Sequence, residues 1–317
     1  MYGTVMVLIA LSTLFFAVLL TWIGISNLLV LTLIVVAFNL VQWLFAPKMI
    51  EALYHVREVS FSDNPKLYRT VERLSRKMKL KMPKLMIASI PIPNAFAYGS
   101  PLTGNRIAVT EELLKVLEDE EVEAVLGHEL GHLKHRDVQI MMFASVLPAI
   151  FYFLGYSLLL SGFFRGYGGY ESREEGTLPA LIIGFVCMTI YWILSLFVLG
   201  LSRYREYYAD RESVFNVEDG ARKLSEALAK IVYYTSRQKS NFRREASGLS
   251  YFKSLFISDP DRAEKDSLNL VLAKRVSDQQ LVNQILTRKL TMADRLMEIF
   301  STHPNIVKRL KALKELE

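Results

Sequence analysis

The apolar residues of this chain fall into long charge-free runs that alternate with two mixed stretches. Residues 1–47 contain no charged side chain, and two further charge-free runs cover 138–164 and 176–202. A helix needs about 20 apolar residues to cross a bilayer, so the first run has room for two spans and each of the others for one. The sequence therefore predicts four transmembrane helices, near 4–22, 28–46, 140–163 and 178–201.

The distribution of charge predicts how these spans are oriented. No Lys or Arg precedes the first run, which is also too long for the apolar part of a signal peptide, so we expect it to stay in the mature protein. The chain carries 38 Lys and Arg against 32 Asp and Glu, whereas the loop 165–175 carries two basic and three acidic residues. Basic residues favour the inner side of a cytoplasmic membrane. We expect both termini, and residues 48–137 and 203–317, in the cytosol.

Removing the spans leaves two soluble stretches that we expect to pack together as one domain. In the first, Asn64 and Pro65 begin a helical pattern, and short extended runs bounded by Pro and Gly predict a small antiparallel sheet. Thr110 is a candidate N-cap of a helix, and a further helix begins near Asp119. The fold class is α+β, mainly α. The predicted division of the chain is 1–47 (transmembrane hairpin), 48–137 (first part of the soluble domain), 138–202 (second hairpin) and 203–317 (second part).

The net charge of +6 is small, and the basic residues cluster at the predicted membrane borders. There they are suited to anionic lipid headgroups, and we expect no nucleic-acid partner. The single cysteine, Cys187, lies in the fourth predicted span and can form no internal disulfide, which agrees with a reducing cytosol.

The motif His128-Glu129-Leu130-Gly131-His132 carries the chemistry. On a helix His128 and His132 lie one turn apart on the same face, so both imidazoles can bind one Zn²⁺, and Glu129 is placed beside a zinc-activated water as its base. The alternative is a surface helix with two hydrogen-bonded histidines. This pattern predicts a zinc peptidase with one Zn²⁺ per chain.

A second pair of acidic residues, Glu206 and Asp210, follows the fourth predicted span at helical spacing. A catalytic zinc site needs a third protein ligand, and a carboxylate is suitable, so we assign Glu206 to that position. Asp210 then accepts the free ring N–H of a ligand histidine. The alternative is that both acids are ordinary partners of the neighbouring arginines.

Four segments together resemble the membrane-bound zinc peptidases of the HtpX heat-shock protease family. They are Asn94–Ala97, His128–His132, Ser202–Asp210 and Ser301–Pro304, in this order along the chain. The resemblance implies a zincin domain of gluzincin type and a zinc endopeptidase of the cytoplasmic membrane. It also implies polypeptide substrates, namely misfolded or damaged membrane proteins, and a role in quality control under stress.

The resemblance also assigns roles to residues that the motifs alone do not explain. The segment Asn94, Ala95, Phe96 and Ala97 is similar to an edge strand onto which a substrate peptide adds; the alternative is a purely structural strand. His303 is similar to a catalytic histidine that stabilises the oxyanion, and Arg309 to an arginine six positions on, which we place among the substrate-binding residues. The alternative for His303 is a place in the first turn of a last helix, 304–316.

Three expectations remain, on the membrane position of the cleft, on residues 237–300 and on alternative functions. His132 precedes Val138 by six residues, about 9 Å of continuous helix, so the cleft should lie at the cytosolic face, where loops or tails of membrane proteins are the substrates. Compared with the shorter bacterial pattern of the family, residues 237–300 form a longer insertion than the resemblance implies, either a mobile lid or a packed helical appendage. Two other functions stay open: a prenyl-protein protease of CAAX type, which shares the motifs but has more spans, and a zinc-stabilised membrane scaffold without activity.

Overall fold

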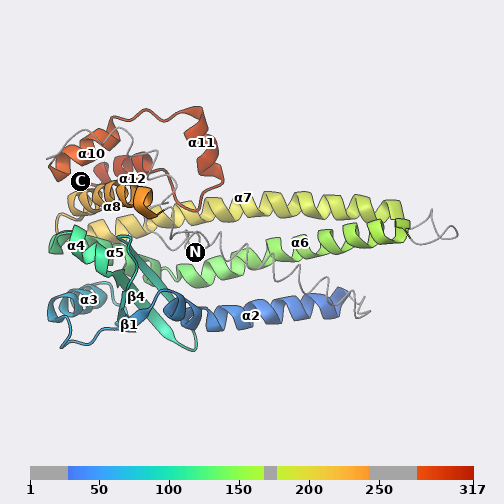
Figure 1. The fold of residues 1–317 in the computed structure, drawn as a ribbon, viewed down its shortest axis with the longest axis horizontal. Helices are drawn as coiled ribbons and strands as arrows, with labels where there is room; N and C mark the ends of the chain where they lie inside the picture. The colour runs from blue at the N-terminus through green and yellow to red at the C-terminus, as the bar shows by residue number, and fades with distance from the viewer. Residues whose placement is uncertain (1–27, 168–176, 243–276) are drawn as a thin grey trace. The chain divides into compact units, whose positions relative to one another are not determined.

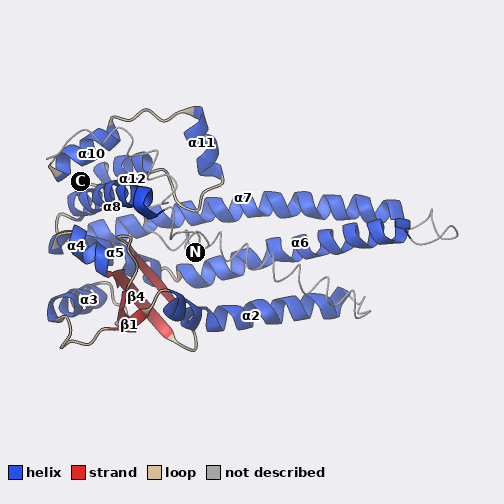
Figure 2. Ribbon diagram, in the orientation of Figure 1, coloured by secondary structure: helices blue, strands red, loops and turns tan. Residues whose placement is uncertain are grey.

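The computed structural model describes residues 28–167, 177–242 and 277–317, and its Cα positions divide into two compact units. One unit comprises Leu44–Val138 and Leu201–Glu317, and the other comprises the described residues up to Trp43 with Gln139–Gly200. Helices predominate and one small sheet accompanies them (Figures 1 and 2). In chain order the elements are α2 (Leu28–Leu53), β1 (Val56–Glu58), α3 (Pro65–Lys77), β2 (Lys84–Ala88), β3 (Ala95–Ser100), β4 (Gly104–Thr110), α4 (Glu111–Val116), α5 (Asp119–Lys134), α6 (Asp137–Tyr167), α7 (Thr177–Asn216), α8 (Gly220–Phe242), α10 (Asp278–Leu286), α11 (Met292–Ile299) and α12 (Ile306–Lys314).

Two helices of the described residues are long and apolar enough to cross a membrane, within α6 over Asp137–Gly162 and within α7 over Leu178–Asn216. The first overlaps the third predicted span, 140–163, and the second contains the fourth, 178–201, and extends beyond it. The second predicted span, 28–46, lies within α2, and the first, 4–22, lies outside the described residues. Four membrane helices are therefore not confirmed, and that number stays a prediction.

The sheet is mixed, so the prediction of an antiparallel sheet was wrong. Its strand order is β1-β2-β4-β3, with β2 and β4 parallel and the two outer pairs antiparallel. The connection from β2 to β3 contains Pro91 and Pro93. Proline lacks a backbone N–H and cannot continue a ladder. The chain therefore crosses to the far edge and returns through a tight turn as β4, which pairs with β2 in the parallel direction.

The alternation of side chains along the strands gives the sheet two different faces. Ala95 and Ala97 of β3 join a large apolar core with α3, α5, α8, α10 and α12. Phe96 and Tyr98 point to the opposite face, where they pack with Tyr54 in a smaller cluster. The period of two expected for a strand therefore places the helix that carries the histidine motif on one face only.

The helix starts predicted from the sequence are confirmed by their caps. The Asn64 side chain accepts a hydrogen bond from the Leu67 amide, and the Thr110 hydroxyl accepts one from the Leu113 amide. The helix α5 begins at Asp119, where Glu118 and Glu121 form a reciprocal capping box. The last helix begins at Ile306 rather than at residue 304, because the Asn305 side chain caps it by accepting from the Val307 amide.

The helix that carries the histidines does not continue into the apolar run, as the sequence had led us to expect. It ends at Lys134, and Arg136 adopts a left-handed backbone conformation with φ of 54° before α6 starts at Asp137. A residue other than glycine rarely adopts that conformation, which costs on the order of 1 kcal/mol. The distance of about 9 Å along a continuous helix is therefore wrong.

The predicted insertion 237–300 forms parts of three helices in the described residues. The helix α8 extends to Phe242, residues 243–276 lie outside the described residues, and α10 and α11 follow. Leu281 and Ile285 of α10 are buried in the large core, where α10 packs on α8 and α12. This part of the insertion is a packed element of the domain, as one of the two alternatives predicted.

Candidate metal centre and active site

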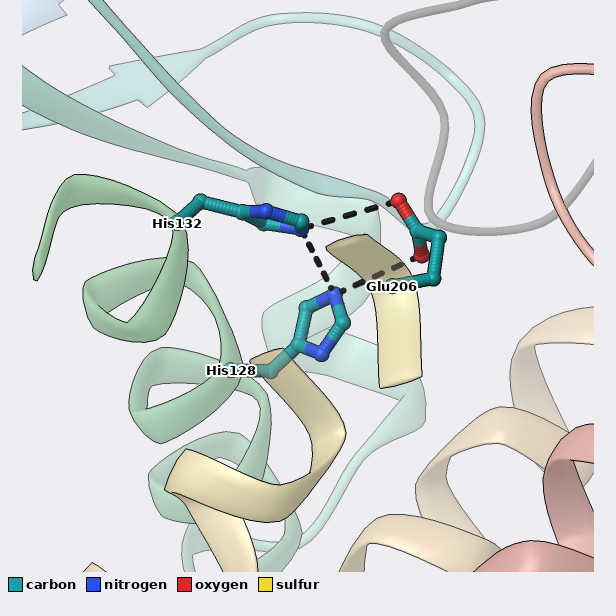
Figure 3. Close-up of side chains that lie close together, drawn as sticks. All are labelled: His128, His132 and Glu206. Atoms are coloured by element: carbon teal, nitrogen blue, oxygen red, sulfur yellow. Dashed lines mark hydrogen bonds and ion pairs between the residues drawn. The ribbon is translucent and has the colours of Figure 1, made fainter. Parts of the chain in front are cut away.

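The side chains of His128, His132 and Glu206 converge on one point from two helices (Figure 3). The two histidines lie one turn apart on α5, and Glu206 comes from α7. Their Nε2 atoms are 3.1 Å apart. The carboxylate closes the triangle, since its Oε2 lies 3.7 Å from Nε2 of His128 and its Oε1 lies 3.6 Å from Nε2 of His132.

The dimensions of this triangle fit a tetrahedral zinc ion. Zinc binds imidazole nitrogen and carboxylate oxygen at about 2.0–2.2 Å, so ligand atoms at tetrahedral angles lie about 3.3–3.6 Å apart. The observed separations, 3.1 Å between the two nitrogens and 3.6 and 3.7 Å from a nitrogen to one or the other carboxylate oxygen of Glu206, lie close to that range. In addition, Oε2 of Glu206 is buried and accepts no hydrogen bond from the described residues, although the guanidinium of Arg309 lies 3.2 Å from it. Both observations fit a cation between the three side chains.

Small residues on α5 allow α7 to approach closely enough to form the triangle. A Cβ atom on Gly131 would lie 3.0 Å from Cα of Ala209, and one on Gly127 would lie 3.0 Å from Oγ of Ser213. The Ser213 hydroxyl also donates a 2.6 Å hydrogen bond to the carbonyl of Ala124. The two helices therefore meet backbone to backbone, and this contact sets the distance between the histidines and Glu206.

The second ring nitrogen of each histidine faces a buried carboxylate. Nδ1 of His128 lies 2.9 Å from Oδ1 of Asp210, and Nδ1 of His132 lies 2.7 Å from Oδ2 of Asp137. Such contacts select the tautomer that leaves Nε2 free to bind a metal. The position of Asp210 beside a histidine agrees with the geometry expected for it, whereas Asp137 was not predicted.

Asp137 was missed because helical periodicity argues against it. Five residues after His132, it would lie on the opposite face of a continuous helix. The left-handed conformation of Arg136 turns the chain and brings the carboxylate back to the imidazole. Arg205 of α7 donates hydrogen bonds both to Asp137 and to the carbonyl of His135, 2.8 Å away in the latter case. The feature of the sequence that could have pointed to Asp137 is its position as the last charged residue before the charge-free run 138–164.

Arg309 of α12 joins the two acidic residues of α7. Its Nε and Nη2 donate to Asp210 at 2.9 and 2.6 Å, and its Nη1 lies 3.2 Å from Oε2 of Glu206. The residue is 2% exposed. The resemblance placed Arg309 among the substrate-binding residues. In the structure, however, its guanidinium contacts the carboxylates of Glu206 and Asp210. We interpret it as a residue that positions Glu206 and Asp210.

The charges around the triangle keep its acids ionised. Burial raises the pKa of the Glu206 carboxyl, but His303 and Arg309 outweigh burial and hold this pKa well below its usual range. Burial likewise raises the pKa of Asp210, and Arg309 and His128 lower it further than burial raises it. Both groups are therefore carboxylates at neutral pH.

His132 responds to the same negative environment. Burial lowers its pKa, but the hydrogen bond with Asp137 and the charges of Glu206 and Glu129 raise it to about 9. The environment thus favours a cation at this point. Among the described residues, four acidic side chains (Glu129, Asp137, Glu206 and Asp210) and two guanidinium groups (Arg205 and Arg309) lie around the triangle, and a divalent cation would offset the excess of acidic groups.

His303 also reaches this site. Its Nδ1 lies 3.2 Å from Oε1 of Glu206, and its Nε2 is buried and has no hydrogen-bond partner among the described residues. The residue lies in the loop before α12, where its amide and carbonyl both bond to the Ser301 hydroxyl. The structure therefore places His303 beside the triangle and outside the last helix.

The predicted peptide-binding segment forms part of the sheet edge. Ala95, Phe96 and Ala97 belong to β3, which pairs with β4 on one side and is the last strand in the sheet order. Asn94 precedes the strand, where its amide donates to the Thr110 hydroxyl at 2.9 Å. The strand β3 packs against α5, the helix that carries Glu129.

The model of peptidase family M48 matches residues 62–317, more than half of the chain and all the site residues just described. The chain belongs to peptidase family M48. This membership confirms the predicted family and establishes a metalloprotease as the class of enzyme. The M48 peptidases are zinc-dependent, and the His-His-Glu triangle agrees with that requirement.

Archaeal relatives of this M48 chain extend the likeness beyond the family region. The chain is 36% identical to a protease HtpX homolog of Thermoplasma acidophilum over 298 residues, which cover 93% of the chain and 87% of the relative. A protease HtpX homolog of Aeropyrum pernix is also 36% identical, over 286 residues that cover 90% and 85%. For protease HtpX homolog 2 of Saccharolobus solfataricus the identity is 34%, with 92% and 87% covered.

A solved structure shows the same fold at low sequence identity. The crystal structure of S. mikatae Ste24p superimposes with a TM-score of 0.55 and 16% identity. The match covers 95% of this chain but only 62% of that protein. The likeness supports the fold of the M48 chain.

Proposed function

We propose that the chain is a membrane-embedded zinc endopeptidase that cleaves misfolded or damaged membrane proteins at the cytosolic face of the membrane. The observation that carries the proposal is the triangle of Nε2 and carboxylate oxygens, with Glu129 adjacent to His128 on the same helix. His128, His132 and Glu206 would hold one Zn²⁺. A bound zinc ion would polarise the scissile carbonyl and lower the pKa of a water molecule.

Glu129 acts as the general base and acid in this proposal. It is 3% exposed, and its charge contributes to the raised pKa of His132, which places its carboxylate near the triangle. It takes a proton from the attacking water and delivers it to the leaving amine. Nε2 of His303 is buried and without a partner in the described residues, and with both ring nitrogens protonated it would donate to the oxyanion while Nδ1 faces Glu206.

The sheet edge provides a place for an extended substrate. Because β3 is the last strand in the sheet order, a peptide can add beside it through main-chain hydrogen bonds, which tolerate many side chains. Asn94 and Ala95–Ala97 are the residues proposed for this contact. Broad tolerance suits an enzyme that recognises unfolded segments.

The membrane location rests on the charge-free helices. We propose four spans, with the two termini and the catalytic residues in the cytosol, because the basic excess of the chain lies outside the loop 165–175. Substrates are then cytosolic loops and tails of membrane proteins. Because enzyme and substrate lie in the same membrane, such a substrate reaches the active site by diffusion within the membrane.

The proposal is tested with the full chain purified and inserted into lipid vesicles. A destabilised membrane protein and a prenylated CAAX peptide are offered separately, with and without a zinc chelator. We expect zinc-dependent cleavage of the membrane protein in its loops and tails, and restoration by one equivalent of zinc after chelation. Cleavage of the CAAX peptide alone would establish the prenyl-protein alternative. Zinc binding without cleavage of either substrate would support a scaffold and overturn the proposal.

A further inference from the structure

The helix α11 exposes its apolar residues and buries its acidic ones. Met292, Leu296 and Ile299 are 76%, 55% and 41% exposed, whereas Asp294 and Glu298 are 9% and 7% exposed. At about 100° per residue, the three apolar side chains lie within an arc of about 60°, and the two acids lie on the other side of the helix. This polarity is the reverse of that of a helix that packs on a soluble core.

The acidic side of α11 is held by the domain. A carboxylate oxygen of Asp294 lies 3.3 Å from Nη2 of Arg288, and the other caps the helix through Thr291. Glu298 accepts from Lys308 of α12 and from the Asn305 amide. These contacts hold the acidic side of α11 against the domain. The rotation of the helix about its axis is therefore fixed, with the apolar side facing outward.

The exposed charges beside this apolar surface are basic. Lys289 precedes α11, and Arg295 lies at the edge of the apolar arc; both are exposed. The two acids of the helix are buried and paired, so they do not oppose this positive charge. A short helix with an apolar face and exposed basic residues is suited to the surface of an anionic bilayer.

Hydrogen bonds from Arg203, which follows a charge-free run, connect α7 to the end of α11. Its Nη1 donates to the carbonyls of Glu298, Ile299 and Ser301 at 2.9, 3.0 and 2.8 Å. Arg203 is the first charged residue after the run 176–202. If that run spans the bilayer, its end marks the level of the headgroups, and α11 is bound at this level.

Aromatic residues of the same region agree with an interfacial position. Tyr204 and Tyr208, four residues apart on one face of α7, are 69% and 56% exposed, and Phe300 at the end of α11 is 63% exposed. Tyrosine is enriched at membrane interfaces, because its ring is apolar and its hydroxyl remains hydrated. The two tyrosines follow Arg203 on α7, so the region just after the charge-free run carries the residue type typical of a bilayer border.

We propose that α11 is an interfacial helix, with Met292, Leu296, Ile299 and Phe300 inserted among the lipids of an anionic membrane surface. The inference rests on the membrane location given under the proposed function and adds a second attachment to it. The loop that carries His303 begins where α11 ends, so this attachment holds one side of the active site at the bilayer surface. The partner is the lipid of the membrane.

Fluorescence quenching in vesicles tests the proposal with the full chain. In a Cys187→Ala background, single cysteines replace Ile193 in the proposed span, Leu296 on α11, or Phe215, and each is labelled with an environment-sensitive fluorophore. Phe215 is the matched control, since it is an exposed apolar residue of α7, about 18 Å beyond Arg203 along the helix axis. Quenching by nitroxide lipids and by aqueous iodide is then compared.

We expect lipid quenching at residues 193 and 296 to exceed that at 215 several-fold, with shallow nitroxides the more effective at 296. Neutral vesicles should weaken quenching at 296 and leave 193 unchanged. Protection from iodide without lipid quenching at 296 would show that protein covers α11, for example residues 243–276, and would overturn the proposal. Iodide access that is lost only when unfolded polypeptide is added would also overturn it, in favour of substrate docking. Absence of lipid quenching at 193 as well would overturn the membrane location itself.

Discussion

Oδ2 of Asp137 lies 2.7 Å from Nδ1 of His132, although Arg136 must adopt a left-handed conformation to bring the two residues together. The backbone strain is retained because this contact orients a proposed zinc ligand and because Arg205 bonds to the turn. A break between a catalytic helix and an apolar helix is therefore part of the site.

Replacing Asp137 with Asn should weaken zinc binding. Asparagine preserves the shape of the side chain but removes the negative charge that stabilises the imidazole orientation, and losses of about 10–100-fold in metal affinity or activity are typical of such partners. Zinc affinity measured by competition with a fluorescent chelator checks the effect. Glu212→Gln is the matched control, because Glu212 contacts His135, which is not one of the proposed ligands. Equal losses in both variants would deny Asp137 this role.

Glu129→Gln should keep zinc and lose proteolysis. Glutamine cannot accept the proton of the attacking water, so the rate should fall by a factor on the order of 10²–10⁴, while His128, His132 and Glu206 still bind the ion. Zinc content by elemental analysis and cleavage of an unfolded polypeptide are measured on one preparation. Glu123→Gln, on the same helix but paired with Arg73, is the control. Residual activity near that of the unaltered chain would exclude Glu129 as the base.

Residues close in sequence were predictable, whereas contacts between distant segments were not. The spacing of His128 and His132 within one turn follows from helical geometry, and the caps at Asn64 and Thr110 follow from residue type. The parallel pairing of β2 with β4 depends on the chain crossing after Pro91, a long-range choice that periodicity does not encode. The sequence therefore predicted strands but not their order.

The partners of the histidines illustrate the same limit. Asp210 could be predicted because it shares a helix and a face with Glu206, but its bidentate contact with Arg309 joins residues 99 positions apart. Asp137 could not be predicted, because the break at Arg136 has no glycine or proline to mark it. Local pattern thus identified the atoms that converge on the triangle better than those that orient them.

Gly131→Val should disturb the site through the helix crossing. Even a Cβ atom at residue 131 would lie 3.1 Å from Cβ of Glu212 and 3.0 Å from Cα of Ala209, so α7 must move away and Glu206 with it. Overpacking of this kind costs about 1–3 kcal/mol, and zinc should bind more weakly. Thermal unfolding and zinc affinity are compared with Glu123→Val, which introduces the same side chain at a position of α5 that already carries a Cβ atom. A variant that keeps both values would show that the crossing tolerates a wider spacing.

The orientation of the chain is testable in intact cells. In a Cys187→Ala background, a cysteine at residue 171 should react with an impermeant thiol reagent added outside, because the proposed topology places the loop 165–175 there. A cysteine replacing the exposed Glu315 should react only after the cells are opened. Labelling of residue 315 in intact cells would reverse the cytosolic assignment, and labelling of neither position in opened cells would show that the reagent fails to reach them.

Glu206 and Asp210 should differ in what their removal does to zinc. Glu206→Ala removes one of three proposed ligand atoms, so zinc should dissociate readily in a graded series of chelators. Asp210→Asn keeps a polar side chain beside Nδ1 of His128 and Arg309, and the loss of its charge should weaken zinc affinity by about 10–100-fold.

Circular dichroism and thermal unfolding identify any variant that fails to fold, which matters because Asp210 is an ion-pair partner of the buried Arg309. Arg309→Lys, in which the charge remains but the bidentate contact is lost, should resemble Asp210→Asn. If folded Asp210→Asn releases zinc more readily than folded Glu206→Ala, the third ligand is the other carboxylate, and the triangle of Figure 3 is not the metal site.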